Sequence, residues 1–295
     1  MSASSSALRC EQLSFAVSRA EGEPTDLEVI GWLCSRGGLD EKTIQVLIHG
    51  ATYDHNVWDF PYRPDRYSYV RAATAAGYAT LNLDRLGHGR SSRLTGDVLD
   101  LEVGAFALHQ IVQALRSGEI ETHRFGPIEA EKILLAGESA GGTLAWMEAG
   151  LYDDVDGIVV AGAAHTFAEG LERVMRATWP VESDPLLRHR GTPPGYFTTI
   201  PGTRGLIYYH LPEVDPIVLL VDELLKQTLT SGEIAGLPAS LPLSELVDVP
   251  TLVTVGDFDD LFCHPPSCTE SGSLDAELET YGPGSCAELL IMPES

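Results

Sequence analysis

The chain is poor in basic residues, with 19 lysines and arginines against 43 aspartates and glutamates, and its formal net charge is −24. A surface of this charge repels a polyanion such as DNA, so we expect no nucleic-acid partner. Long apolar runs are also lacking, and no segment reaches about 18 uninterrupted apolar residues, so no membrane-spanning helix is expected. Residues 1–15 lack the basic and apolar regions of a secretory signal, which predicts a cytoplasmic location without membrane contact.

Cysteine is scarce as well. The five cysteines are Cys10, Cys34, Cys263, Cys268 and Cys286. An odd and sparse set is not typical of a disulfide framework, and the cysteines around His264 match no zinc-binding motif. We therefore expect structural or incidental thiols and no metal site.

The hydrophobic share of 44% over 295 residues fits a large α/β domain, and the order of the predicted elements supports this class. Alternating residues in Leu13–Val17 and Leu27–Leu33, separated by the turn-prone AEGEPTD, predict an antiparallel hairpin. From Lys42 onward, β-rich runs such as IQVLIHG and KILLAG alternate with helical segments such as LEVGAFALHQIVQALRSG. This order predicts strand–helix–strand crossovers and a mainly parallel sheet with helices on both faces.

The alternation of strands and helices stops between residues 164 and 248. This part is first rich in proline and glycine (TPPGYFTTIPGTRG) and then helical (DPIVLLVDELLKQTLTSGEI), after which PTLVTVGD and CAELLIMPES read as strands. The simplest organisation is one α/β core interrupted by an insertion, rather than two independent domains. We predict the first part of the core at 1–163, a mostly helical cap at 164–248 and the remaining part of the core at 249–295.

The segment KILLAGESAGG, at 132–142, carries the strongest chemical signal. An apolar run passes directly into G-E-S-A-G and then into a helical segment, which is the context required of a nucleophile elbow at Ser139. In open parallel sheets, ligands bind beyond the carboxyl ends of the strands, where this serine is expected. The N–H of Ala140 would begin a helix and could stabilise an oxyanion. The alternative is a glycine-rich helix start that cradles a phosphate.

Three carboxylates follow the predicted strand of LVTVGDFDDLF, at Asp257, Asp259 and Asp260. A carboxylate at a strand end can orient a histidine and stabilise its charged form during proton transfer. The position of these residues leaves the choice among them open.

Other polar residues fall near the same predicted sheet edge. Tyr53, Glu138 and His165 are predicted substrate contacts, with cap packing as the alternative for His165. His49, in the glycine turn of VLIHGATYD, is interpreted as a hydrogen-bond partner of its own loop backbone.

Four motifs together resemble the α/β-hydrolase fold family, and the resemblance spans nearly the whole chain from about residue 27. They are the HG turn at 49–50, the D-x-x-G-x-G stretch at 84–89, the G-x-S-x-G elbow at 137–141 and the G-x-x-D run at 256–259. The single HG turn is similar to that of small-molecule hydrolases in the family, whereas GESAGG is similar to the elbow of type B carboxylesterases.

The resemblance implies a role for each motif. Ser139 matches the nucleophile, and the N–H groups of Ala51 and Ala140 match the two oxyanion-hole donors. Asp259 matches the acid, because the family's spacing favours it over Asp257. The resemblance also implies a cap after the sixth strand and a reaction that needs no metal or organic cofactor.

The family's triad histidine follows the last strand, and here the sequence departs from the pattern. ELLIMPES is predicted to be that strand, and no histidine follows His264. A serine without an adjacent base is a weak nucleophile, so we expect the 295-residue chain to hydrolyse esters poorly. The chain is accordingly interpreted as truncated before the catalytic histidine, with a truncated inactive product or a non-hydrolytic protein as alternatives.

The leading functional hypothesis is a serine hydrolase that cleaves a carboxylic ester, thioester or lactone of a small apolar molecule through an acyl-enzyme on Ser139. Its only expected partner is this small-molecule substrate. Two alternatives stay open: a ligand-binding protein of the same fold that has lost the proton shuttle, and a lyase or cyclase that acts on a natural-product intermediate.

Overall fold

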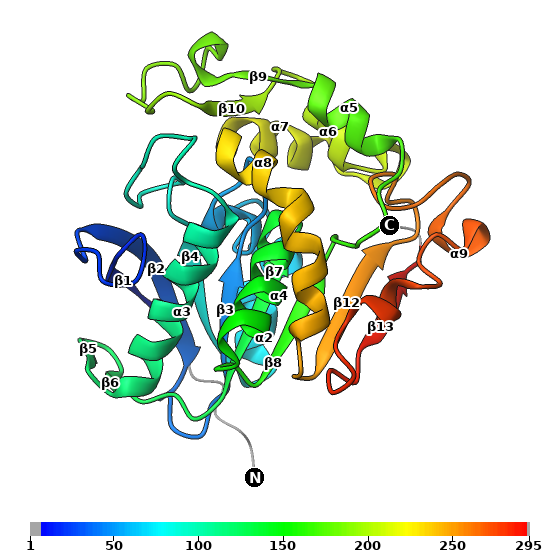
Figure 1. Cartoon of the computed structure of the whole chain (residues 1–295). Helices are drawn as coiled ribbons and strands as arrows, with labels where there is room; N and C mark the ends of the chain where they lie inside the picture. Colours follow the sequence, from blue (N-terminus) through cyan, green and yellow to red (C-terminus); the bar gives the residue numbers. More distant parts are fainter. Residues whose placement is uncertain (1–6, 294–295) are drawn as a thin grey trace.

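The computed structural model describes residues 7–293 and is built around an eight-stranded sheet (Figure 1). In spatial order the strands are β1 (Leu8–Val17), β2 (Leu27–Arg36), β4 (Ala79–Asp84), β3 (Ile44–Ile48), β7 (Ile133–Glu138), β8 (Gly157–Ala161), β12 (Thr251–Gly256) and β13 (Glu288–Met292). The pairs β1–β2 and β2–β4 are antiparallel, and all neighbours from β4 to β13 are parallel. The predicted α/β class, N-terminal hairpin and mainly parallel sheet are confirmed.

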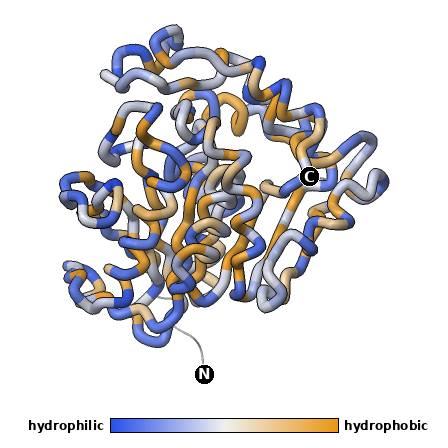
Figure 2. Tube along the Cα trace, viewed as in Figure 1, coloured by the Kyte–Doolittle hydropathy of each residue, from blue (hydrophilic) through white to orange (hydrophobic). Residues whose placement is uncertain are grey.

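The central strands are continuous apolar runs because both of their faces are covered. Every residue of β3 and β4 is buried, as expected for parallel strands between two layers. The edge strand β13 instead alternates exposed and half-buried residues. Figure 2 shows the same contrast, with apolar segments gathered in the central strands and hydrophilic ones around the periphery.

Helices cover both faces of this sheet. The longer ones in the core are α2 (Tyr69–Ala75), α3 (Leu101–Ser117), α4 (Ala140–Tyr152) and α8 (Ser231–Ser240). Helices α3, α4 and α8 pack together on one face, whereas α2 places Val70 against Leu47 and Ala136 on the other. Helix α4 directly follows β7, a central strand of the sheet, so its first turn lies at the carboxyl end of that strand.

The segment between β8 and β12 lies over the carboxyl ends of the strands (Figure 1). It contains α5 (Gly170–Arg176), β9 (Thr178–Pro180), β10 (Tyr196–Thr199), α6 (Arg204–Tyr208), α7 (Pro216–Leu225) and β11 (Leu229–Thr230). Strands β9, β10 and β11 form a small antiparallel sheet, so this cover is not purely helical.

The structure differs from the predicted cap boundary at residue 248. Helix α8 packs against α3, and the 3-10 helix η4 (Leu241–Leu246) packs against α4, so both belong to the layer that covers the sheet. Trp146 of α4 donates its indole N–H to the carbonyl of Ser240 at 3.1 Å. The cover thus ends near residue 230, because α8 and η4, which follow it, pack against α3 and α4.

The remaining elements are short. They are η1 (His55–Val57), α1 (Pro64–Tyr67), β5 (Ile120–Thr122), β6 (Gly126–Ile128), η2 (Val181–Ser183), η3 (Leu211–Glu213), α9 (Cys268–Ser271) and η5 (Glu277–Thr280).

Arg204 forms a buried ion pair within the cover and also bonds to the loop after β3. The Arg204 guanidinium, 1% exposed, makes a two-point contact with Asp222 at 2.6 and 3.0 Å and donates to Thr52 Oγ1 at 2.9 Å. The Thr52 backbone in turn accepts from the N–H of Gln227 and donates to the carbonyl of Thr228, both at 2.9 Å. These bonds fix the cap over the loop that contains the HG turn.

Two disulfides contradict the expectation of free thiols. Cys10 and Cys34 are directly opposed across β1 and β2, and Cys263 pairs with Cys268 in the loop after β12, while Cys286 is free. Only the strand register brings the first pair together, which residue spacing does not reveal. Disulfides persist mainly in oxidising compartments, so they weigh against the predicted cytoplasmic location. Between residues 7 and 293, no helix combines the length and apolarity needed to cross a bilayer.

Candidate active site

Ser139 sits on a sharp turn between β7 and α4. Its backbone has φ 52° and ψ −119°, a conformation that costs a non-glycine residue about 1–3 kcal/mol. A Cβ on Gly137 would lie 2.0 Å from the carbonyl oxygen of Gly141, and a Cβ on Gly141 would lie 2.1 Å from that of Ile48. Backbone crowds the turn on both sides, so the G-x-S-x-G spacing is a steric requirement.

The two predicted oxyanion donors line the same cavity as Ser139. Ala140 begins α4, so its N–H has no partner within the helix. Ala51 follows the HG turn after β3. In the part of the chain that the structure describes, neither N–H has a hydrogen-bond acceptor. Both groups are thus available to a ligand oxygen in the cavity.

The HG turn is held by side-chain bonds to its own backbone. His49 Nδ1 donates to the carbonyl of Gly50 at 2.8 Å, and its Nε2 accepts the N–H of Arg85 at 3.1 Å. The Arg85 guanidinium donates to the carbonyls of His49 and Gly50 at 2.8 and 3.2 Å. Burial, helped by the charge of Arg85, holds the pKa of His49 well below its usual value, so the ring is neutral. These bonds agree with the interpretation of His49 as a backbone partner.

Glu138 lines the cavity and also supports this turn. Its Oε2 accepts the N–H of Gly50 at 2.9 Å. Burial, reinforced by the charge of Asp259, raises the pKa of Glu138 to about 7, although the Gly50 bond and the guanidiniums of Arg204 and Arg85 oppose the shift. The predicted substrate contact is therefore also a clamp between the elbow and the HG turn. Tyr53 lines the cavity too, with Arg204 4.4 Å from its ring centre.

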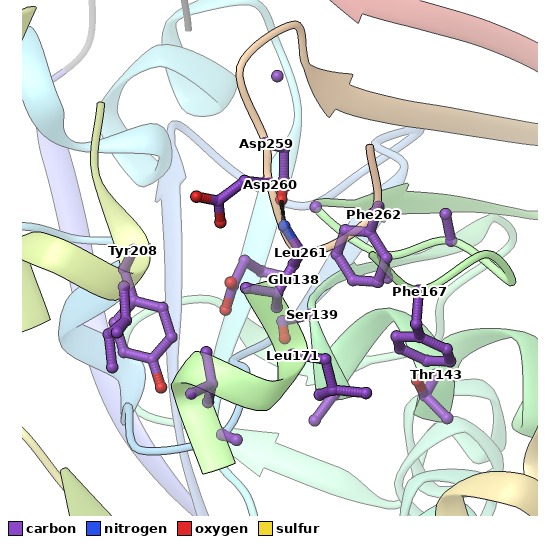
Figure 3. Close-up of a pocket in the computed structure, with 18 of the residues that line it drawn as sticks. Glu138, Ser139, Thr143, Phe167, Leu171, Tyr208, Asp259, Asp260, Leu261 and Phe262 are labelled. Atoms are coloured by element: carbon purple, nitrogen blue, oxygen red, sulfur yellow. Dashed lines mark hydrogen bonds between the residues drawn. The ribbon is translucent and has the colours of Figure 1, made fainter. Parts of the chain in front are cut away.

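Asp259 is the carboxylate among the three candidates that combines partial burial with a place in the cavity wall (Figure 3). Its Oδ1 accepts the N–H of Leu261 at 3.0 Å, and burial raises its pKa. Asp260 also reaches the cavity but is half-exposed and ion-paired with Arg173. Asp257 accepts the N–H of Thr269 at 2.9 Å and lies outside the wall.

The structure describes all nine histidines, and none of their rings is hydrogen-bonded to Ser139 or Asp259. His264 is exposed. His165, predicted as a substrate contact, is not among the residues of the cavity wall. Its Nδ1 and backbone N–H bond to Glu277 at 2.8 and 2.9 Å, and its ring stacks on Trp146. The Glu277 carboxylate holds His165 in the layer beneath the cap.

His210 is a cavity residue that the sequence analysis did not select. It lines the wall with Ser139 and Asp259, and its ring stacks on Phe258 at a centre-to-centre distance of 4.4 Å. The signal in the sequence was weak, because the residue follows two cap tyrosines in a stretch without clear periodicity. Only the folding of the cap over β12 brings it to the loop that contains Asp259.

The cavity itself has a volume of about 540 Å³ and lies between the elbow and the cap (Figure 3). Its walls are mainly apolar, with Phe167, Leu171, Phe262 and Leu237 among the lining residues. The polar lining residues include Glu138, Ser139, Thr143 and Asp259. Such a space fits a small molecule whose reactive group faces the elbow and whose remainder is apolar.

Comparison with known proteins agrees with the geometry. Residues 45–284 match the family model described as the alpha/beta hydrolase family. The chain belongs to the alpha/beta hydrolase family. The resemblance to this family that the sequence motifs indicate is therefore confirmed. No match to a curated protein was found.

Solved structures show the same alpha/beta hydrolase fold at low identity. The alpha/beta hydrolase GrgF from Penicillium sp. sh18 has a TM-score of 0.61 and 15% identity, over 97% of this chain and 90% of that one. E-2-(acetamidomethylene)succinate hydrolase has a TM-score of 0.58 and 14% identity, over 97% and 92%. The thioesterase domain from the curacin biosynthetic pathway has a TM-score of 0.51 and 16% identity, over 97% and 93%. At these identities the likeness concerns the fold.

Proposed function

We propose that this alpha/beta hydrolase cleaves a carboxylic ester, thioester or lactone of a small apolar molecule through an acyl-enzyme on Ser139. The observation that carries the proposal is the strained serine of the elbow, which shares one cavity with the unpartnered N–H groups of Ala51 and Ala140. An oxyanion that forms when Ser139 attacks a carbonyl would accept hydrogen bonds from these donors, each worth about 10²–10³ in rate.

Asp259 is proposed to orient the imidazole that takes the serine proton. It is half-buried in the cavity wall, where a carboxylate can stabilise an imidazolium. The resemblance assigns this imidazole to the segment that follows the last strand. The N–H of Asp257 donates to the carbonyl of Met292 at 2.9 Å, so the carboxyl end of β13 lies beside the loop that carries the acid. The imidazolium would pass this proton to the leaving alcohol or thiol as the bond between that group and the acyl carbon breaks, which leaves the acyl group on Ser139. The same base would then activate water to release the acid and free Ser139.

The apolar wall supports an apolar substrate. A chain with a net charge of −24 also disfavours a polyanionic ligand by long-range repulsion. Two of the structurally similar proteins are named as a hydrolase and a thioesterase domain, and these names are compatible with the proposed hydrolysis.

Fluorophosphonate labelling of the protein tests the proposal. We expect one covalent adduct, mapped by mass spectrometry to Ser139, and none in Ser139→Ala. A known serine esterase labelled in parallel controls for probe quality. If the wild type stays unlabelled while the control esterase reacts, the acyl-enzyme mechanism is overturned.

A ligand-binding protein without turnover is the second candidate. It is favoured by the lack of any imidazole bonded to Ser139 between residues 7 and 293. Incubation with p-nitrophenyl esters in ¹⁸O-labelled water separates the candidates. Hydrolysis must place solvent oxygen in the acid product, whereas saturable binding with no labelled acid supports the binding protein.

A further inference from the structure

A second cluster of ligating groups lies between α3 and α4, at the opposite end of α4 from Ser139. It consists of His109 on α3, Glu148 on α4 and Asp154 just after α4, and each offers one ligand atom within 4.8 Å of the other two. Glu148 lies nine positions after Ser139, about 13 Å along a helix. The cluster is therefore separate from the candidate active site.

Glu148 is the unusual member of this cluster. Its side chain is 0% exposed, and no N–H or hydroxyl group among the described residues donates to either carboxylate oxygen. The polar group that Glu148 does meet is the Asp154 carboxylate, with which it can hydrogen-bond only if one of the two is protonated. The Oδ1 atom of Asp154 is also buried without a partner. Burying an unpaired carboxylate costs several kcal/mol, and a second carboxylate nearby adds repulsion. Either a proton or a metal cation must therefore lie between these oxygens.

The surrounding side chains position the cluster but do not neutralise Glu148. The Arg116 guanidinium donates to the backbone carbonyl of Asp154, at 3.0 and 2.9 Å, and to the carboxylate of Asp156, at 2.7 Å. The remaining Asp154 oxygen, Oδ2, accepts from His109 Nδ1 at 2.7 Å and from Gln113 at 2.6 Å. The ring of Tyr152 stacks on His109 at 4.1 Å. The imidazole and the Asp154 loop are thus held in place around the open oxygens.

A comparison within the molecule shows how a satisfied cluster looks. Asp54, His55 and Asp84 also lie within 4.8 Å of one another. There, however, Asp84 accepts from His55 and Arg90, and Asp54 accepts from Asn56 and Gln227. Protein donors complete that cluster, whereas no N–H or hydroxyl group of the described residues donates to the carboxylate of Glu148.

We propose that His109, Glu148 and Asp154 bind a divalent transition-metal cation that joins α3 to α4. One imidazole with two carboxylates is a ligand set suited to Zn²⁺, and water can complete the coordination. The cation would neutralise the two carboxylates and fix the helix that carries Ser139 from its far end. The site is structural, since it is remote from the cavity.

Titration of the chelator-treated full-length protein with Zn²⁺ tests this site by calorimetry and by thermal unfolding. We expect about one ion per chain with a Kd below about 10 μM, and a melting temperature that rises with free Zn²⁺. Glu148→Gln keeps the shape and removes the charge, and should weaken binding at least tenfold. Asp153→Asn is the matched control, because Asp153 is exposed and its left-handed backbone suits asparagine.

A second variant keeps the test decisive if Glu148→Gln does not fold. Cobalt loaded into the wild type should give visible absorption bands from a nitrogen-containing site, and His109→Gln should shift or abolish them. Equal Zn²⁺ affinity in wild type, Glu148→Gln and His109→Gln would overturn the proposal. Absence of Zn²⁺ binding by wild type at about 100 μM would overturn it too, and would leave a proton shared by Glu148 and Asp154 as the neutralising group.

Discussion

The carboxylate of Glu138 accepts the backbone N–H of Gly50 at 2.9 Å. Glu138 directly precedes the candidate nucleophile Ser139, and Gly50 directly precedes the candidate oxyanion donor Ala51. The elbow and the HG turn come from adjacent parallel strands, β7 and β3. This single bond couples their positions. Glu138 is consequently a positioning residue for Ala51 as well as part of the cavity wall.

The raised pKa of Glu138 predicts a specific pH dependence of stability. Its folded value of about 7 exceeds the ordinary value of 4.5, so the folded state binds its proton more tightly than the unfolded state does. The contribution of Glu138 to the free energy of unfolding is therefore full below pH 4.5 and declines as pH rises toward 7. Urea unfolding of wild type and Glu138→Gln at several pH values should show a flatter dependence in the variant. Parallel curves would contradict the raised pKa.

Ser139→Gly should stabilise the protein relative to Ser139→Ala. Both variants lose the hydroxyl, but only glycine adopts φ 52° without strain. The backbone strain that glycine relieves in the folded state is larger than the stability it loses through the greater conformational entropy of the unfolded chain. We therefore expect the glycine variant to have a free energy of unfolding about 1 kcal/mol higher than the alanine variant. Urea denaturation measures it. An alanine variant more stable than the glycine variant would show that the elbow is unstrained.

Asp222→Asn should destabilise the protein strongly. It leaves the buried Arg204 guanidinium without its carboxylate, at a cost of about 3 kcal/mol in the free energy of unfolding. Glu23→Gln is the control, because the Arg19–Glu23 pair is exposed and solvent screens its charges, so its loss should leave the free energy of unfolding almost unchanged. Equal losses in the two variants would contradict the role of burial.

His210→Asn tests whether the cap supplies the base. If His210 only stacks on Phe258 and contacts substrate, KM should rise several-fold and kcat should stay within about tenfold of the wild type. Steady-state kinetics across pH give both quantities. A loss of about 10³-fold or more in kcat, with loss of the imidazole limb of the pH profile, would make His210 the base in place of a residue after β13.

The core fold and the elbow could be predicted because both depend on short-range patterns. KILLAG must be a buried strand, and GESAGG follows it without a spacer, so the turn and its serine are local features. The cap boundary could not be placed, because α8 is assigned to the core by its contact with α3. The Cys10–Cys34 pair likewise required the strand register.

The sequence by itself determined the α/β class, the strained Ser139 turn and the carboxylates after β12, since periodicity and steric limits act over a few residues. Only the tertiary structure decided which groups meet: Glu138 with Gly50, His210 with Phe258, and Glu148 with Asp154 and His109. The reason is physical. Contacts between distant segments depend on how whole elements pack, and the loops that join the short elements of the cap give no periodic signal of where their side chains will lie.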